Sequence, residues 1–358
     1  MHSWYLYLFL RYNLHIQNVP ALIIEIAPSE ETGNLSVMHL KRYWQKIQLK
    51  KQGKLDQDSL KNEFQTDVML LSALGLGLHQ TLQYLYAEGG SFEQFENWII
   101  ETTGGLDPAK VNRFNASFTG EQITGEETSE PDVLEAADHA FWKENGYIIV
   151  RNAVPKEDCD LAIAAICDFL GIDRYDPSTW YSDHPAKSGI MVQMFQHPVF
   201  ERNRNAFKIR KAFQEIWGRR DVFVNTDRAG FNPPQTSSFQ FYGPFLHWDV
   251  SLQLPIPFGT QGILYLADTA ENQGAFTLVP GFQNKIDDWM ESLPAGANPR
   301  QQDLYALGPK PIAANAGDFI LWHQALPHGS SPNNAALPRF VQYINYEPSD
   351  LVHAENWI

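Results

Sequence analysis

The sequence predicts a mainly β protein with flanking helices, attached to an N-terminal all-α segment. Residues 35–102 place apolar side chains at helical spacing, which predicts several packed helices. From Val192 onward, short apolar runs are separated by Pro, Gly and Asn, which indicates many short strands in a sandwich or barrel. Between these parts, residues 125–131 are polar and acidic, which is typical of a linker. We therefore expect an N-terminal helical domain over residues 1–125 and a second domain over residues 126–358.

The N-terminal part contains three apolar patterns and one helix-start signal. Trp4–Leu10 is too short to span a bilayer and lacks the features of a secretion signal, so we expect a buried strand or helix. Val37–Ile47 and Phe64–Leu85 follow i, i+3, i+4 spacing, which predicts helices. Ser91, three residues before Gln94, predicts a capping box at the start of another helix.

The second part opens with helices around one strand. Val133–Glu144 predicts a helix, Tyr147–Arg151 a strand, and the stretch from Pro155 to Leu170 a second helix. Six later apolar runs predict strands: Val222–Val224, Phe239–Phe241, Gly262–Leu266, Phe276–Val279, Phe319–Trp322 and Phe340–Tyr346. We expect Asp287–Tyr305 to be an insertion, part helix and part loop.

Composition argues against several classes of partner. A formal net charge of −15 disfavours nucleic acid or an anionic membrane surface, and we expect no membrane span. The two cysteines, Cys159 and Cys167, lie on one predicted helix. Their spacing corresponds to about 12 Å at the rise of a helix, too far for a disulfide. Two free thiols indicate a reducing cytoplasm.

Two histidines and one aspartate near the C-terminus carry the predicted chemistry. His247 and Asp249 are two residues apart, so both reach the same face of an extended strand. His328 follows the apolar run Phe319–Trp322, where it can face the same cavity. A 2-His-1-carboxylate set binds one face of Fe(II) and leaves the other open for oxygen chemistry. Downstream, Arg339 is suited to pair with the carboxylate of a co-substrate such as 2-oxoglutarate.

Three segments around these residues resemble the phytanoyl-CoA dioxygenase family. They are Phe141–Val154, Gly274–Gly281 and Gly317–Asn333, in the order that the family has them. The resembling core spans about residues 135–347. The resemblance implies a double-stranded β-helix, a jelly-roll barrel of the cupin-like kind, that binds Fe(II) and 2-oxoglutarate and uses O2.

By position, the resemblance implies a role for each site residue. His247, Asp249 and His328 match the iron ligands, Arg339 matches the residue that binds the distal carboxylate of 2-oxoglutarate, and Ser330 matches a hydroxyl that helps to hold it. The implied reaction decarboxylates 2-oxoglutarate to succinate and CO2 while the substrate is oxidised. Relatives that halogenate have a small residue in place of the aspartate, so the aspartate here favours hydroxylation or a related oxidation.

One competing ligand and one departure from the family need attention. His323 stands five residues before His328, but only His328 has the family's His-Gly-Ser context, so we expect a supporting or core role for His323. Relatives often follow Pro-Gly with Ser-His, whereas Pro280-Gly281 is followed here by Phe282-Gln283. This puts in doubt any substrate or lid role of the missing histidine.

Polar residues expected near the open face of the iron are the candidate binding residues. Gln240 and Tyr242 lead into the His247 stretch and are expected to face the cofactor cavity. Candidate substrate contacts are Lys187, Gln193, Asn225 and Arg228. A solvated or structural role stays open for each of the four candidate substrate contacts.

The leading hypothesis is an Fe(II)/2-oxoglutarate-dependent dioxygenase that hydroxylates or otherwise oxidises a small molecule, with specialised metabolism as one setting. One alternative is a non-catalytic β-barrel relative that binds a ligand, and another is a cupin-like metalloenzyme that does not use 2-oxoglutarate. The basic stretch from Lys41 to Lys54 is either a solvated helix face, a dock for an acidic carrier protein, or part of a dimer or lid element.

Overall fold

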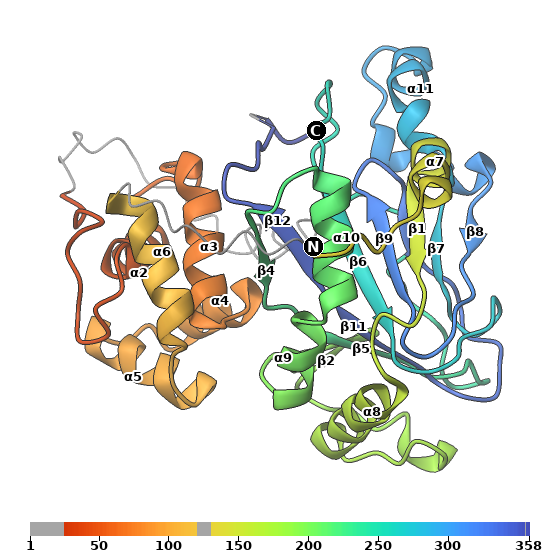
Figure 1. The fold of residues 1–358 in the computed structure, drawn as a ribbon, viewed down its shortest axis with the longest axis horizontal. Coiled ribbons are helices and arrows are strands. Elements are labelled where there is room, and N and C mark those ends of the chain that lie inside the picture. Colours follow the sequence, from red (N-terminus) through yellow and green to blue (C-terminus); the bar gives the residue numbers. More distant parts are fainter. Residues whose placement is uncertain (1–24, 120–129, 355) are drawn as a thin grey trace.

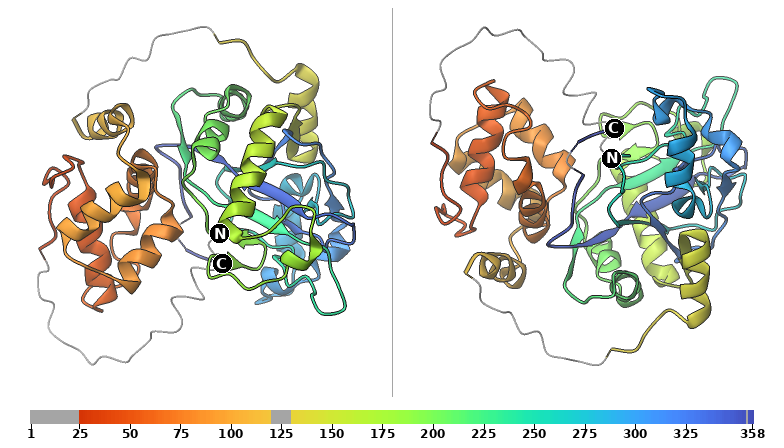
Figure 2. Two further views of the ribbon diagram at one scale, coloured as in Figure 1. Left: turned by 90° about the horizontal axis from the view of Figure 1, so that it is seen from below. Right: turned by 90° about the horizontal axis from the view of Figure 1, so that it is seen from above.

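The computed structural model describes residues 25–119, 130–354 and 356–358. The run Trp4–Leu10 and most of the predicted linker lie outside the described residues. In the described ranges, no helix has the length and apolar character needed to cross a bilayer. Figure 1 shows a group of helices lying beside a larger, sheet-containing part, and Figure 2 shows the same arrangement from below and from above.

The N-terminal group of helices builds a core of its own. Its α-helices are α2 (Leu40–Lys51), α3 (Phe64–Leu74), α4 (Leu78–Ala87), α5 (Phe92–Thr103) and α6 (Pro108–Thr119), with the 3-10 helix η2 (Lys61–Glu63) before α3. The capping box predicted at Ser91 is confirmed, because its hydroxyl accepts the Gln94 N–H and the Gln94 side chain accepts the Ser91 N–H. Tyr43, Leu70 and Phe95 are among the buried side chains at the centre of these helices.

Strands of the second part form three antiparallel sheets. They are β1 (Tyr147–Val150), β2 (Lys187–Ser188), β3 (Met191–Val192), β4 (Val222–Asn225), β5 (Ala229–Asn232), β6 (Thr260–Tyr265), β7 (Phe276–Leu278), β8 (Lys310–Pro311), β9 (Phe319–His323), β10 (His328–Ser330), β11 (Arg339–Tyr343) and β12 (Asn345–Pro348). The largest sheet has the order β1-β9-β6-β11-β5-β3-β2, the second has the order β10-β7-β8, and β12 pairs with β4. The N-terminal helices and the antiparallel core confirm the predicted double-stranded β-helix with an all-α segment.

Helices flank the sheets. They are α7 (Ala136–Asn145), α8 (Lys156–Leu170), α9 (Pro198–Arg204), α10 (Phe207–Trp217) and α11 (Ile286–Ser292), and the short 3-10 helices are η3 (Pro177–Thr179), η4 (Phe282–Asn284), η5 (Pro299–Gln301) and η6 (Leu304–Leu307). α8, α9 and α10 pack on one face of the large sheet (Figure 1), where Phe213 contacts Phe319. The opposite face forms a second core with the smaller sheet, and this core includes Ile263, Ile320 and Val341.

Three expectations about local structure are corrected by the structure. The predicted strand Phe239–Phe241 does not form, because the Thr236 hydroxyl accepts the N–H groups of Ser238 and Phe239 and closes a turn. His247 and Asp249 lie in an irregular segment in which only His247 makes an isolated bridge, to His328. Helices α9 and α10 form where the sequence indicated only β structure.

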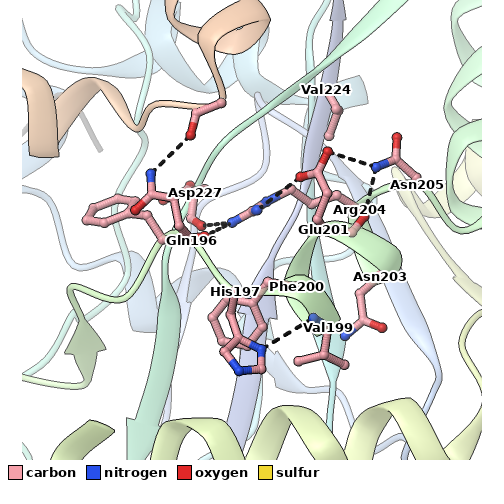
Figure 3. Close-up of polar contacts among 12 residues, drawn as sticks. Gln196, His197, Val199, Phe200, Glu201, Asn203, Arg204, Asn205, Val224 and Asp227 are labelled. Carbon is pink, nitrogen blue, oxygen red and sulfur yellow. Dashed lines mark hydrogen bonds and ion pairs between the residues drawn. The ribbon is translucent and has the colours of Figure 1, made fainter. Parts of the chain in front are cut away.

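The N-terminal helices dock on the ribbon of β4 and β12. Gln65 Nε2 donates to the Pro348 carbonyl at 2.9 Å and to Glu347 Oε1 at 3.2 Å, and the Ser72 hydroxyl donates to the Val224 carbonyl. Beside this contact, Gln196 exchanges hydrogen bonds with a helix of the N-terminal group. Figure 3 shows Gln196 together with Arg204, a buried side chain that donates to two backbone carbonyls.

Candidate metal and co-substrate site

His247, Asp249 and His328 converge as the sequence predicted. The distance from His247 Nε2 to Asp249 Oδ1 is 3.4 Å, and that from His328 Nε2 to Asp249 Oδ2 is 3.3 Å. One ligand atom from each of the three residues lies within 4.8 Å of the others. This spacing allows a single ion to contact all three side chains.

Local backbone pairing positions the three candidate ligands. His247 and His328 exchange two backbone hydrogen bonds of 2.9 Å, which holds the irregular segment against the start of β10. Between the two ligands of that segment, Trp248 turns the other way, is fully buried and donates its indole N–H to the Ala325 carbonyl. The side chains of His247 and Asp249 therefore point to one side and that of Trp248 to the other, as in a strand, although this segment is not a regular strand.

The protonation of both imidazoles suits a metal ion. Burial lowers the pKa of His247 to about 3 and that of His328 to about 4, so both rings are neutral near pH 7. Each Nδ1 faces a backbone carbonyl, that of Phe245 at 2.6 Å and that of Leu326 at 3.0 Å, and must carry the proton to donate. The Nε2 lone pairs therefore point toward the Asp249 carboxylate. The two Nε2 lone pairs and the carboxylate oxygens are all acceptors and face one another, and a bound cation stabilises such an arrangement.

Arg339 is the second unusual feature of the site. It opens β11 opposite Asn232 of β5, and its side chain is fully buried. In the described part of the chain, none of its three guanidinium nitrogens has a hydrogen-bond partner of acceptable geometry. Burial raises the pKa values of Tyr265 and Tyr343, and the Arg339 guanidinium opposes this rise through its charge and a contact with each hydroxyl.

A carboxylate ligand would complete this arrangement. A buried charge without a partner is costly, and a guanidinium matches a carboxylate in planar, bidentate geometry. Ser330 lies on β10 two residues after His328, so both residues share one face of that strand, and its side chain is buried. The donor set therefore fits an acid such as 2-oxoglutarate beside the metal ligands.

The structure separates His323 from the three ligands. His323 ends β9, its Nδ1 accepts the N–H of Ala325 at 3.0 Å, and its ring packs against Phe258 and Trp142. Burial lowers its pKa to about 4. These contacts describe the core role that the sequence favoured.

Gln240 and Tyr242 have contacts different from those expected. The exposed Gln240 side chain donates to the Thr236 carbonyl in its own turn, at 2.6 Å. Tyr242 is 81% exposed to solvent. Among the described residues, neither side chain makes a hydrogen bond to the three ligands or to Arg339.

The four candidate substrate residues divide into two groups. Lys187 donates to the Ser182 and Trp180 carbonyls, and burial lowers its pKa, so this cation is engaged within the chain. Arg228 pairs with Asp227 at 3.1 Å. Gln193 and Asn225 each keep a buried side-chain oxygen without a hydrogen-bond partner.

Sequence reasoning missed four residues around the site. Gln261 donates to Asp249 Oδ2 at 2.8 Å and accepts the Trp322 indole N–H at 3.2 Å. Tyr265 and Tyr343 lie beside the guanidinium. Tyr343 shares a strand and a face with Arg339 at i+4, so period-2 counting along that strand could have found it.

Comparison with known proteins points to one family. The profile of the phytanoyl-CoA dioxygenase family matches residues 142–341. A Dictyostelium discoideum protein with a provisional phytanoyl-CoA dioxygenase name is 24% identical over 267 residues, which are 60% of this chain and 76% of that protein.

Solved structures give more distant likenesses. EctD from S. alaskensis with bound Fe has 17% identity and a TM-score of 0.46, over 65% of this chain and 84% of that one. The epimerase SnoN, in complex with Fe3+, alpha-ketoglutarate and nogalamycin RO, has 16% identity and a TM-score of 0.44, over 61% of this chain and 84% of that one.

Proposed function

The chain belongs to the phytanoyl-CoA dioxygenase family of Fe(II)/2-oxoglutarate-dependent oxygenases, and we propose that it hydroxylates or otherwise oxidises a small molecule while 2-oxoglutarate is converted to succinate. One observation carries this proposal: the barrel contains a His-Asp-His cluster and a fully buried arginine that has no carboxylate partner in the described residues. A ligand-binding barrel without catalysis has no need of both features.

Each residue of the site has a distinct task in this proposal. His247, Asp249 and His328 would hold Fe(II) on one side, and Arg339 with Ser330 would hold the distal carboxylate of 2-oxoglutarate. Once bound, iron and 2-oxoglutarate supply the chemistry that activates O2 and oxidises the substrate. The barrel core beside these residues is apolar, which keeps water away from the reacting groups.

Substrate contacts are proposed for residues with unused polar atoms. The buried side-chain oxygens of Gln193 and Asn225 could accept hydrogen bonds from a substrate, and Arg228, already paired with Asp227, could add a donor. Support for Lys187 is weaker, because backbone carbonyls engage its ammonium group. Tyr242 fits a position at the rim better than one beside the cofactor, because most of its side chain is exposed.

We further propose two domains, residues 1–125 and 126–358, with the helices acting as a support for the barrel. Several cations of the basic stretch are already bound within the chain. Lys46 lies 2.6 Å from Asp67 and 3.1 Å from Glu63, Arg42 also pairs with Glu63, and Lys51 donates to the Leu85 carbonyl. This leaves less positive surface for an acidic carrier protein than the sequence suggested, so we favour a free small molecule.

A reducing compartment such as the cytoplasm fits the two thiols. Cys159 and Cys167 are free and buried. Burial raises the pKa of Cys159 to about 12 and that of Cys167 to about 11, so neither thiol is readily ionised.

The test is succinate release under air with Fe(II), 2-oxoglutarate and a panel of small molecules. We expect slow uncoupled succinate formation that a true substrate stimulates, with a gain of one oxygen or loss of two hydrogens by mass spectrometry. A protein that binds iron but never forms succinate would instead match a metalloenzyme that does not use 2-oxoglutarate. Arg339→Met serves as a matched control, because it removes the carboxylate partner without touching the metal ligands.

A further inference from the structure

We propose that Gln261 and Trp322 position the carboxylate of Asp249 for iron, an inference that rests on the proposed function and deepens it. Gln261 lies in β6 and Trp322 in β9, and the two residues are register partners in the large sheet. Neighbouring strands β6 and β9 are labelled in Figure 1. Because partners in an antiparallel pair point to the same face, both side chains enter the barrel, where they contact the site.

The two hydrogen bonds run in one direction. The Trp322 indole N–H donates to Gln261 Oε1 at 3.2 Å, and Gln261 Nε2 donates to Asp249 Oδ2 at 2.8 Å. An indole nitrogen can only donate, so it must meet the oxygen of the amide. The amide NH2 then has to face the carboxylate. Trp322 therefore sets the orientation in which Gln261 reaches Asp249.

Trp322 also contacts a second ligand. Its ring centroid lies 5.2 Å from that of His328 and 4.3 Å from that of Phe276. The indole is buried at 3% exposure, so its packing leaves it little freedom to turn. One side chain therefore packs against an imidazole ligand and, through an amide, orients the carboxylate ligand.

The contacts of Gln261 favour a positioning role over a purely structural one. Both ends of its amide are hydrogen-bonded to side chains of the site, and among the described residues no backbone group makes a hydrogen bond with that amide. The half-buried amide contributes a donor to a carboxylate, and hydrogen bonds to charged groups are the stronger ones. Outer partners of this kind orient metal ligands, and their loss typically weakens metal binding about 10- to 100-fold.

Iron affinity tests the proposal without turnover. Fe(II) is titrated anaerobically into the full chain, and binding is followed by the charge-transfer absorption that develops with 2-oxoglutarate. We expect Gln261→Leu to raise the Kd for Fe(II) by roughly 10- to 100-fold. Trp322→Phe keeps the aromatic bulk and removes the donor, so we expect a smaller loss in the same direction. The matched control is Gln214→Leu, a half-buried glutamine on α10 that donates to the Arg220 carbonyl, which should bind iron like the wild type.

A double variant separates positioning from packing. If Trp322 acts through Gln261, Trp322→Phe has no further effect on the Kd in a Gln261→Leu background. Additive losses would overturn the proposed chain of hydrogen bonds, and so would a Gln261→Leu protein that binds iron within about twofold of the wild type. If Gln261→Leu does not fold, the test uses Trp322→Phe only. A wild-type Kd for Fe(II) in that variant would overturn the proposal. A wild-type protein that binds no Fe(II) would instead overturn the proposed function itself.

Discussion

Arg339→Met should make the ligand-free protein more stable while removing its response to 2-oxoglutarate. The wild-type guanidinium is fully buried, no carboxylate forms a salt bridge with it in the described residues, and its polar neighbours include the Tyr265 and Tyr343 hydroxyls. A buried polar group without a partner costs about 1–3 kcal/mol, and a charged group costs more. Methionine has a similar length and no charge, and it would pack against the same apolar barrel core.

From these values we expect the free energy of unfolding of the ligand-free variant to rise by about 2 kcal/mol. For a chain of 358 residues that corresponds to a rise in Tm of about 3 °C. With 2-oxoglutarate at a hundred times its Kd and a redox-inert divalent metal, the wild type should gain about 2.7 kcal/mol. The variant should gain almost nothing, so the ligand reverses the order of stability of the two proteins.

Thermal unfolding with and without 2-oxoglutarate measures both effects. Arg300→Met is the matched control, because Arg300 donates to the Trp248 carbonyl at 2.8 Å and the Ile358 carbonyl at 3.0 Å, so its removal should lower stability. The reasoning is refuted if Arg339→Met destabilises the ligand-free protein as Arg300→Met does, or if 2-oxoglutarate stabilises both the variant and the wild type.

Three further predictions concern other parts of the molecule. His328→Ala should abolish anaerobic Fe(II) binding whereas His323→Phe retains it, and equal losses in iron titrations would contradict the assignment of the third ligand. Burial raises the pKa of Glu347 from 4.5 to about 7, so folding favours the neutral carboxyl group. The stabilisation that this group gives is therefore complete below pH 4.5 and is lost as the pH rises through 7. In the wild type, the free energy of unfolding from urea curves should decline by up to roughly 3 kcal/mol between pH 4.5 and 8, and Glu347→Gln should remove this decline. An unchanged decline in the variant would contradict this prediction. Gly262→Ala should lower the free energy of unfolding by about 1–3 kcal/mol, because the added Cβ would lie 2.1 Å from a Phe319 ring carbon and 2.6 Å from the Ile344 carbonyl oxygen. Wild-type stability of the variant in denaturant would show that the sheet accommodates the methyl group.

The elements that the sequence predicted well are those whose signal is local. Apolar runs predicted most of β6, β7, β9 and β11, because buried strands are nearly continuous in apolar side chains. The candidate ligand set of His247, Asp249 and His328 was predictable from the His-x-Asp spacing together with the family's segments. In contrast, Phe239–Phe241 has strand-like composition, and the nearby Thr236 hydroxyl turns it into a loop.

Contacts between distant residues were out of reach of the sequence. Nothing near Gln261 or Trp322 in the chain marks them, because their roles depend on the pairing of β6 with β9. The same holds for the docking of Gln65 on Pro348, which joins residues 283 positions apart. Tertiary geometry decides such contacts, and a single sequence carries no direct record of it.

Strand β11 begins with Arg339, and β12 follows it after one intervening residue. Gln65 donates hydrogen bonds to Glu347 and Pro348 at the far end of β12. Arg339, the proposed contact of 2-oxoglutarate, and the residues that bind Gln65 thus lie on one continuous stretch of backbone. A shift of the N-terminal helices would move the same stretch of backbone that positions the Arg339 guanidinium. We therefore expect that mutations at the contact between Gln65 and β12, far from any reacting atom, will change the affinity of the protein for 2-oxoglutarate.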